Sequence, residues 1–310
     1  MSFFNRAFAK FAYVVGDTAN NINPKRLLYK PDFHPDSPLG ENEISVKWFG
    51  TAAYRIEYGG TVLWIDPYFS RHRFLELRSK PLEPKTSEID RYMDRADYIV
   101  IGHSHYDHAA DLSHIVPKTG ATVFGSASTG NLFDLFKMPK DRFTEVTGGD
   151  TVEAGPIKVT FVRSVHGKLM GRIPFNFDIS LRSNAPLTAQ EYGCGEVFTP
   201  IIEVGGYRIY HQGSGGIVDD TLRGLRADLA LIGVSSRKAT PKMVYRVVKE
   251  LQPKVVMPMH YDQFFWPIDW GMMLIPGINF RQVLTQSLEA APDAEVITLP
   301  LCGEYRIGSR

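Results

Sequence analysis

Short apolar runs alternate with polar turns along most of the chain, and their length and spacing predict strands and helices. Three β-prone runs come first, and the Gly59-Gly60 pair between the second and the third is typical of a hairpin turn. The pattern predicts strands at residues 45–49, 55–58, 61–65, 98–101, 122–124, 158–162, 207–210, 229–232 and 254–257. It predicts helices at residues 87–95, 126–136, 219–226 and 240–251.

The order of these elements favours an α/β fold. Antiparallel hairpins followed by strand–helix alternation, twice along the chain, indicate two sheets packed together with helices outside. The 310 residues, 44% of them hydrophobic, are enough for one large core or for two fused half-domains. We therefore divide the chain into an N-terminal helix and linker, residues 1–44, and one domain, residues 45–310.

The N-terminal segment reads MSFFNRAFAKFAYVV. Its apolar residues recur at helical spacing from Phe4 to Val15, with basic residues between them. This pattern predicts an amphipathic helix packed on the main domain. A helix lying on a membrane surface through residues 1–15 and an unusual targeting segment are the alternatives. Residues 30–40 are rich in proline and turn formers and are predicted to be a linker.

Composition and charge narrow the classes of function. The formal net charge of +1 gives no indication of a nucleic-acid partner. The two cysteines, Cys194 and Cys302, are too few for a disulfide framework and fit a reducing compartment. No apolar run approaches the roughly 20 residues that a membrane-spanning helix needs. We expect a cytoplasmic protein, with membrane association through residues 1–15 as the alternative, and the sequence indicates no oligomeric state.

The stretch IGHSHYDHAADL concentrates three of the nine histidines and an aspartate within six positions. It follows a predicted strand, and on an extended strand end His103 and His105 point the same way. Asp107 and His108 come where the chain turns into a helix expected to begin near Ala109. Imidazole nitrogens and a carboxylate are ligands for zinc, iron or manganese, so the cluster predicts a metal site.

Two further histidines follow predicted strands and could complete such a site. His166 comes after VTFVRSV, and His260 comes after KVVMPM. The carboxyl ends of strands that gather on one edge of a sheet form ligand sites. His34 in the predicted linker and His114 on a predicted helix face are not expected to take part. His72 could approach a substrate but has no ligand-like surroundings.

The stretch GHSHYDHAAD carries a His-x-His-x-Asp-His signature and resembles the metallo-β-lactamase-fold hydrolases. Residues 48–70 resemble the opening hairpin of that fold, which ends in a buried aspartate, here Asp66. Residues 161–168 and 257–264 resemble the segments that supply later metal ligands. Within this superfamily the chain looks most similar to the branch of ascorbate-phosphate lactonase-like proteins and N-acylphosphatidylethanolamine phospholipase D.

The resemblance implies an αββα four-layer sandwich with one or two metal ions at one edge, most often zinc, with manganese or iron as alternatives. The ligands of the implied first site are His103, His105 and His166. The ligands of the implied second site are Asp107, His108 and His260. Asp66 is implied to orient a ligand histidine. A metal-bound hydroxide is the implied nucleophile, held or oriented by Asp107 and His108.

One position departs from the family pattern. The segment YRIYHQGSGG has Ser214 where these proteins usually have an aspartate that bridges two metals. A serine hydroxyl is neutral and a weak ligand, so one negative charge and one bridge are missing. The chain could bind one metal at the three-histidine site, or two metals with a weaker second one. It could also be a binding module with a degraded site, although the other ligands remain.

Three segments are predicted to shape a substrate pocket. Residues 70–80 contain arginines that could hold a phosphate, and residues 264–277 form an aromatic stretch directly after His260. Residues 168–195 form a connection of a length that is more common in functional loops. The predicted substrate-binding residues are Tyr106, Tyr261, Arg73, Phe265 and Trp266.

These features together predict a metal-dependent hydrolase acting on an ester, a lactone or a phosphodiester. Apolar residues beside arginines suit a small or lipid-like substrate. A non-catalytic metal- or ligand-binding protein on the same fold and a mononuclear iron oxygenase are the alternatives. Metal content, oxygen consumption and the effect of His103→Ala distinguish the three.

Overall fold

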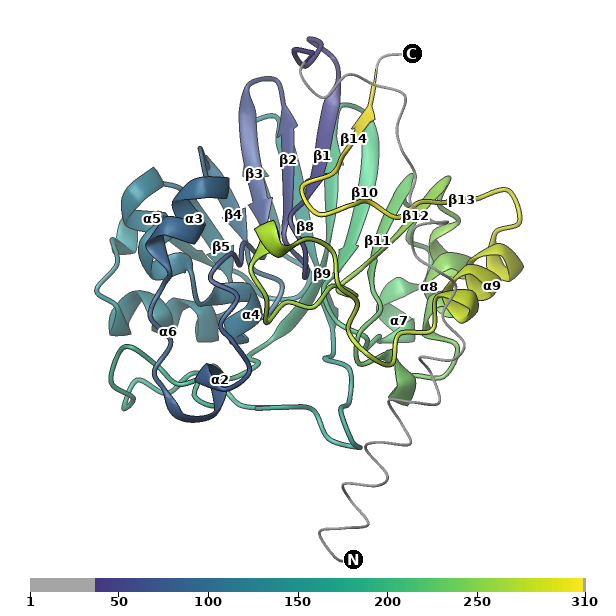
Figure 1. The fold of residues 1–310 in the computed structure, drawn as a ribbon. Coiled ribbons are helices and arrows are strands. Elements are labelled where there is room, and N and C mark those ends of the chain that lie inside the picture. The colour runs from purple at the N-terminus through teal and green to yellow at the C-terminus, as the bar shows by residue number, and fades with distance from the viewer. Residues whose placement is uncertain (1–36, 309–310) are drawn as a thin grey trace, which may run out of the picture.

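Two seven-stranded β-sheets pack face to face in the computed structural model, which describes residues 37–308 (Figure 1). The helix predicted at residues 1–15 and most of the predicted linker lie outside the described residues. Among the described helices, none is long and apolar enough to span a bilayer. The two sheets with helices on their outer faces form the predicted α/β αββα sandwich.

The first sheet has an antiparallel half and a parallel half. In spatial order its strands are β14 (Glu304–Ile307), β1 (Ile44–Trp48), β2 (Tyr54–Tyr58), β3 (Thr61–Ile65), β4 (Tyr98–Val100), β5 (Thr122–Gly125) and β6 (Phe143–Glu145). Pairing is antiparallel from β14 to β3 and parallel from β3 to β6. The C-terminal strand β14 therefore returns to pair with the first strand of the chain.

The second sheet also has an antiparallel half and a parallel half. In spatial order its strands are β13 (Glu295–Val296), β12 (Val255–Met259), β11 (Leu229–Gly233), β10 (Tyr207–Gln212), β9 (Val197–Val204), β8 (Ile157–Ser164) and β7 (Thr151–Ala154). Pairing is antiparallel from β7 to β10 and parallel from β10 to β13. The buried strands β11 and β12 are nearly all apolar, as expected for parallel strands covered on both faces.

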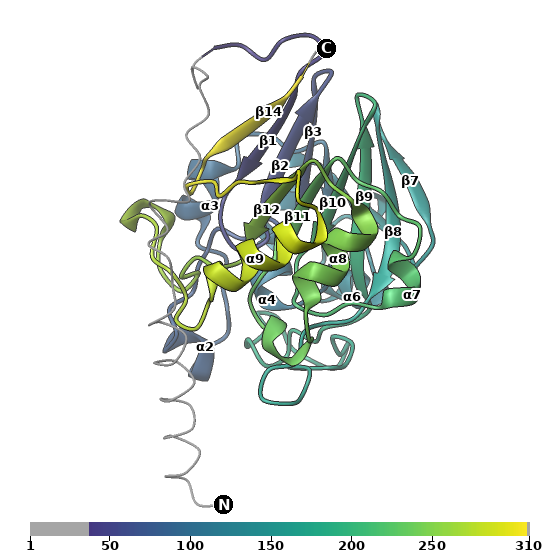
Figure 2. The ribbon, with the colours of Figure 1, turned by 90° about the vertical axis from the view of Figure 1, so that its right-hand side faces the viewer.

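Helices cover the outer face of each sheet (Figures 1 and 2). The helices beside the first sheet are α3 (Thr86–Tyr92), α5 (Leu112–Thr119) and α6 (Ala127–Leu135); those beside the second are α7 (Asp219–Leu222), α8 (Met243–Leu251) and α9 (Phe280–Ala290). Two short helices, α2 (Glu76–Ser79) and α4 (Tyr106–Ala109), lie in the connections. One apolar cluster fills the space between the sheets and extends under α8 and α9, and a second lies under the helices of the first sheet.

Several predicted boundaries differ from the structure. The helix predicted at residues 219–226 is only the single turn α7, and the turn α4 begins at Tyr106 rather than near Ala109. The strands β6, β7, β9, β13 and β14 and the helices α2 and α9 were not predicted from the sequence. Strand β9 contains Pro200, which pairs with Phe161 of β8. Proline usually argues against a central strand, which explains why this strand was not predicted from the sequence.

Candidate metal centre

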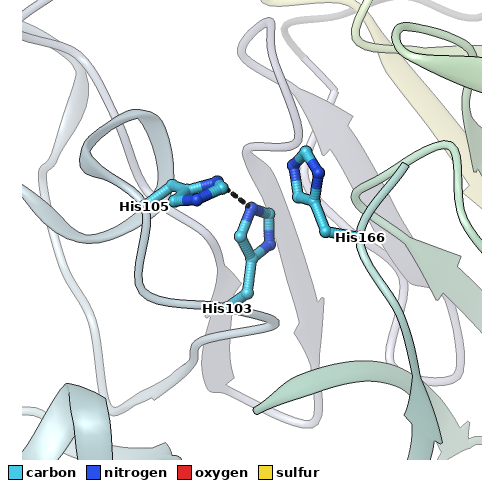
Figure 3. Close-up of side chains that lie close together, drawn as sticks. All are labelled: His103, His105 and His166. Carbon is cyan, nitrogen blue, oxygen red and sulfur yellow. Dashed lines mark hydrogen bonds between the residues drawn. The ribbon is translucent and has the colours of Figure 1, made fainter. Parts of the chain in front are cut away.

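Three histidines that follow strands of the two different sheets meet at one edge of the sandwich. Strand β4 ends at Val100 and leads to His103 and His105, whereas β8 ends at Ser164 and leads to His166. One ring nitrogen of each histidine lies within 4.8 Å of the others. The three rings lie around a common point (Figure 3). We call these three histidines the first triad.

Backbone hydrogen bonds fix the protonated nitrogen in two of these rings. His105 Nε2 lies 3.1 Å from the Pro174 carbonyl oxygen, and His166 Nδ1 lies 2.7 Å from the Gly167 carbonyl oxygen. A carbonyl oxygen only accepts, so these nitrogens carry the protons and the opposite nitrogens keep lone pairs. His105 Nδ1 lies 3.1 Å from His103 Nε2 (Figure 3). The first triad is therefore arranged as a set of ligands for one ion.

A second triad consists of Asp107, His108 and His260. The first two residues lie on α4, and His260 directly follows β12. Their ligand atoms lie within 4.8 Å of one another. Asp107 Oδ2 lies 3.3 Å from His260 Nε2 and 3.8 Å from His108 Nε2. The carboxylate gives this triad a negative charge that the first triad lacks.

Asp66 holds His108 from the side away from the second triad. Its Oδ2 lies 2.8 Å from His108 Nδ1, and its Oδ1 accepts a hydrogen bond of 2.7 Å from the Gly102 backbone N–H. Such a carboxylate–histidine contact orients the ring and leaves Nε2 for a metal. A Cβ on Gly213 would lie 3.0 Å from Asp66 Oδ2, so a larger residue would disturb this contact.

Burial keeps the histidines of the first triad neutral. It lowers the pKa of His103 well below the usual value, and the neighbouring imidazoles lower it further. Burial also lowers the pKa of His105 to about 4 and the pKa of His166 to about 3. Burial opposes ionisation of Asp107, but the neighbouring histidines hold the pKa of its carboxyl below the usual range. Neutral imidazoles and an ionised carboxylate are the forms that bind metals.

These donors fit divalent transition metals. Three imidazole nitrogens match the donor set of three-histidine catalytic zinc sites, and two imidazoles with one carboxylate match hydrolytic zinc sites of another common type. All six ligand residues except His166 are buried, and His166 is partly buried. A metal is therefore the group that best explains why so many polar side chains converge here.

Ser214 lies beside both triads. Its hydroxyl accepts a hydrogen bond of 2.8 Å from the backbone N–H of Gly167, the residue after His166. Gln212 secures the turn that carries it, because its side-chain amide donates to the carbonyl oxygens of Ser214 and Gly216. The turn therefore has a defined structure without a carboxylate, and the serine adds no charge to the metal centre.

Replacing Ser214 with aspartate is expected to tighten the binding of the weaker of two metal ions. The substitution adds a carboxylate beside six ligands, and we expect a dissociation constant lower by about tenfold or more, the scale of effects of groups around a metal. Calorimetric titration of metal-free protein with Zn²⁺ measures this constant. Ser235→Asp adds the same charge elsewhere on the cavity wall and serves as the control. Equal effects of the two substitutions would contradict the role given to this position.

A buried network ties the loop of His260 to the loop of Thr51, and both loops contain strained backbone. Thr51, Asp66 and His260 have φ angles of 49°, 48° and 58°, a region that non-glycine residues rarely adopt and that is often found at functional sites. The backbone N–H of His260 donates to the Thr51 carbonyl at 2.9 Å, and the Thr51 N–H donates to Asp262 at 2.7 Å. Asp262 in turn forms a buried ion pair of 2.6 Å with Arg71.

A cavity of about 320 Å³ opens onto both triads. Its lining includes His105, Asp107, His166 and His260 from the triads, together with Ser214. Two loops add apolar side chains to the lining. The main apolar side chains are Leu169, Phe175, Phe264, Phe265, Ile275 and Ile278. The predicted roles of residues 168–195 and 264–277 as pocket segments agree with this lining.

The five predicted substrate-binding residues divide into two groups. Tyr106 and Phe265 line the cavity, but Tyr261 does not. The Tyr261 hydroxyl donates to the Leu299 carbonyl at 2.9 Å, and its ring packs on Trp48 in the core. The prediction for Tyr261 is therefore wrong. The left-handed backbone at the preceding residue turns this side chain into the core, which sequence adjacency could not reveal.

Arg73 and Trp266 also lie outside the cavity lining. The Arg73 guanidinium lies 5.6 Å from the ring centre of Trp270, and Trp266 packs edge-to-face on the same ring. Neither side chain lines the cavity, and their contact with the substrate stays a prediction. Arg71, which sequence reasoning grouped with Arg73, is buried in the ion pair with Asp262. Arg71 and Arg73 are close together in the sequence, but the first side chain is buried and the second is exposed.

Sequence reasoning missed four residues that the site uses. Phe175 and Phe264 line the cavity, Gln212 holds the turn at Ser214, and Asp262 anchors the loop of His260. The two phenylalanines lie in segments already predicted to shape the pocket. Asp262 lies two residues after a predicted ligand, which is the one sequence signal that could have suggested it. Gln212 has no such signal.

Comparison with known proteins supports the resemblance to the metallo-β-lactamase-fold hydrolases. Residues 45–260 match the model of the β-lactamase superfamily domain. A UPF0173 metal-dependent hydrolase from Anaeromyxobacter sp. strain K is 28% identical over 240 residues, which cover 74% of this chain and 78% of that protein. A UPF0173 metal-dependent hydrolase from Methanosarcina mazei is 27% identical, with 72% and 85% covered.

Solved structures share the fold. Igni18, a metallo hydrolase from Ignicoccus hospitalis, superposes with a TM-score of 0.59 at 18% identity, covering 86% of this chain and all of that one. CmlA, a diiron β-hydroxylase from Streptomyces venezuelae, superposes with a TM-score of 0.56 at 14% identity, covering 88% of this chain and 55% of that one. Because residues 45–260, more than half of the chain, match the family model, the chain belongs to the β-lactamase superfamily.

Proposed function

We propose that the chain uses one or two metal ions to hydrolyse an ester, a lactone or a phosphodiester that carries an apolar group. The observation that carries the proposal is a cavity whose lining combines residues of both triads with apolar side chains. The triads suit hydrolytic chemistry, and Phe175, Phe264 and Phe265 provide a surface for an acyl or alkyl chain. This surface is consistent with the predicted lactonase- and phospholipase-like branch, which stays a prediction.

A divalent metal in this site would lower the pKa of a coordinated water toward neutrality and polarise a carbonyl or phosphoryl oxygen. The chain supplies the remaining functions. The Asp107 carboxylate is ionised, so it can help to hold a metal or accept a hydrogen bond from a water and orient it. Burial and the nearby Asp107 raise the pKa of Tyr106 well above its usual value. The phenol of Tyr106 thus keeps its proton and can donate a hydrogen bond to a leaving oxygen.

Phe265→Ala is expected to raise KM for an eight-carbon nitrophenyl ester by about tenfold and to leave a two-carbon ester unchanged. The ring lines the cavity, and its loss removes apolar contact with the chain of the substrate. Trp266→Ala is the matched control, because this neighbouring aromatic residue lies outside the cavity lining. Steady-state kinetics on the two esters measures the difference. Equal effects of the two variants would contradict the placement of the substrate chain.

The reaction class is tested with metal-loaded protein on soluble esters, lactones and phosphodiesters of matched chain length. We expect turnover of at least one class and no oxygen consumption. The absence of turnover in all three classes at full metal loading would overturn the proposal. Oxygen consumption with iron-loaded protein would favour an oxygenase.

A further inference from the structure

Exposed large apolar side chains concentrate in three segments, two of which also line the cavity. Among residues 37–308, ten of the eleven such side chains lie in residues 73–80, 165–182 and 264–277, and Leu288 on α9 is the exception. The most exposed are Leu75 at 74% and Met170 at 69%. We call the ten the apolar collar; they are Phe74, Leu75, Val165, Leu169, Met170, Phe177, Leu181, Trp266, Trp270 and Met273.

Direct contacts join the three segments into one surface. The rings of Phe74 and Phe265 meet edge-to-face with centres 5.9 Å apart. Leu169 lines the same cavity as Phe265, so the second and third segments border one cavity. The connection that contains the second segment also bonds to the first, because Gln190 donates to the Leu77 carbonyl at 2.9 Å. Helix α2 and the loop between β8 and β9 lie at the same end of the molecule in both views (Figures 1 and 2).

The collar carries an excess of positive charge. Its three segments contain six exposed basic side chains: Arg73, Arg78, Lys80, Lys168, Arg172 and Arg182. Their exposed acidic side chains are Asp178 and Asp269, and Asp269 bonds to Arg91. Basic and aromatic side chains together on one surface are typical of proteins that bind anionic lipid surfaces.

We propose that the apolar collar docks the protein on an anionic membrane surface with the cavity mouth facing the lipid. An isolated exposed apolar residue needs no explanation, but a contiguous group around a cavity indicates an interaction site. A second copy of the chain is a poorer occupant, because a two-fold contact would bring the same basic side chains together. The docking itself requires neither a bound metal nor turnover, so it can fail or succeed independently of the proposed hydrolysis.

The test is sedimentation of the full chain with vesicles of phosphatidylcholine alone or with one third phosphatidylglycerol. We expect binding to the anionic vesicles and a loss of binding when salt is raised from about 0.1 M to about 1 M, which shortens the screening length from about 10 Å to about 3 Å. The double variant Leu75→Glu/Met170→Glu should lower the partition coefficient by at least about tenfold, because it removes apolar contact and adds repulsion. Neither residue lines the cavity, and both are exposed, so the variant should fold normally.

Leu288→Glu is the matched control, because it makes the same type of change at an exposed leucine outside the collar. It should bind vesicles like the unaltered protein. Equal binding by the collar variant and the control would overturn the proposal, as would equal binding to neutral and anionic vesicles. A collar-dependent dimer without vesicle binding, measured by light scattering, would overturn it in favour of a second copy of the chain.

Discussion

His166→Ala is expected to reduce hydrolytic activity by about a thousandfold. The substitution removes one of three ligands in the first triad, where the metal would supply several kcal/mol of transition-state stabilisation, at about 1.4 kcal/mol per factor of ten. His166 comes after the end of β8 and is only partly buried, so the sandwich should remain folded. Initial rates on the best substrate of the panel, together with metal per chain, measure the effect.

His114→Ala is the control for this substitution. His114 lies on α5 and bonds to Asp90 at 2.7 Å on the surface, away from the triads. Its loss should change neither metal content nor rate. If His166→Ala kept full activity with a full complement of metal, the first triad would not be the metal site.

Asp262→Ala is expected to destabilise the fold on the order of 3–5 kcal/mol, since it leaves the buried Arg71 guanidinium without its partner. Both side chains of this pair are about 1% exposed. Asp262 also accepts the hydrogen bond from Thr51, whose carbonyl binds the backbone of His260. The variant should therefore also weaken metal binding at the second triad. Denaturant unfolding and metal titration measure the two effects separately.

Arg223→Ala is the comparison for the ion pair. Arg223 and Asp220 form a pair of 2.9 Å on the surface, with side chains 76% and 83% exposed. Exposed pairs contribute little because water and salt screen them. Similar destabilisation by Asp262→Ala and Arg223→Ala would show that the buried network does not hold the loops of Thr51 and His260.

The metal centre was predictable because its ligands follow a spacing that few other arrangements produce. His103, His105, Asp107 and His108 lie within one short connection, so their chemistry can be recognised without the fold. His260 was recognisable because it directly follows an apolar strand. The two sheets also followed from the alternation of apolar runs, since each buried strand needs a contiguous apolar sequence.

The surroundings of the centre depend on contacts between distant segments. Arg71 and Asp262 are separated by 191 positions, and nothing local indicates that they form an ion pair. The side chain of Tyr261 points into the core because the backbone at His260 is left-handed, which the residue type does not encode. Likewise Arg73 lies against Trp270 rather than in the cavity. Residue types predicted which side chains converge at the candidate metal centre, whereas side-chain directions in loops required the structure.

Metal per chain, measured by elemental analysis of protein purified without chelator, tests the central claim most directly. We expect at least one zinc, manganese or iron ion per chain, with a marked loss in His166→Ala and full retention in His114→Ala. Two ions per chain would show that the second triad binds without a bridging carboxylate at Ser214. No bound metal after reconstitution with these ions, or equal metal content in both variants, would contradict the assignment of the triads as a metal centre.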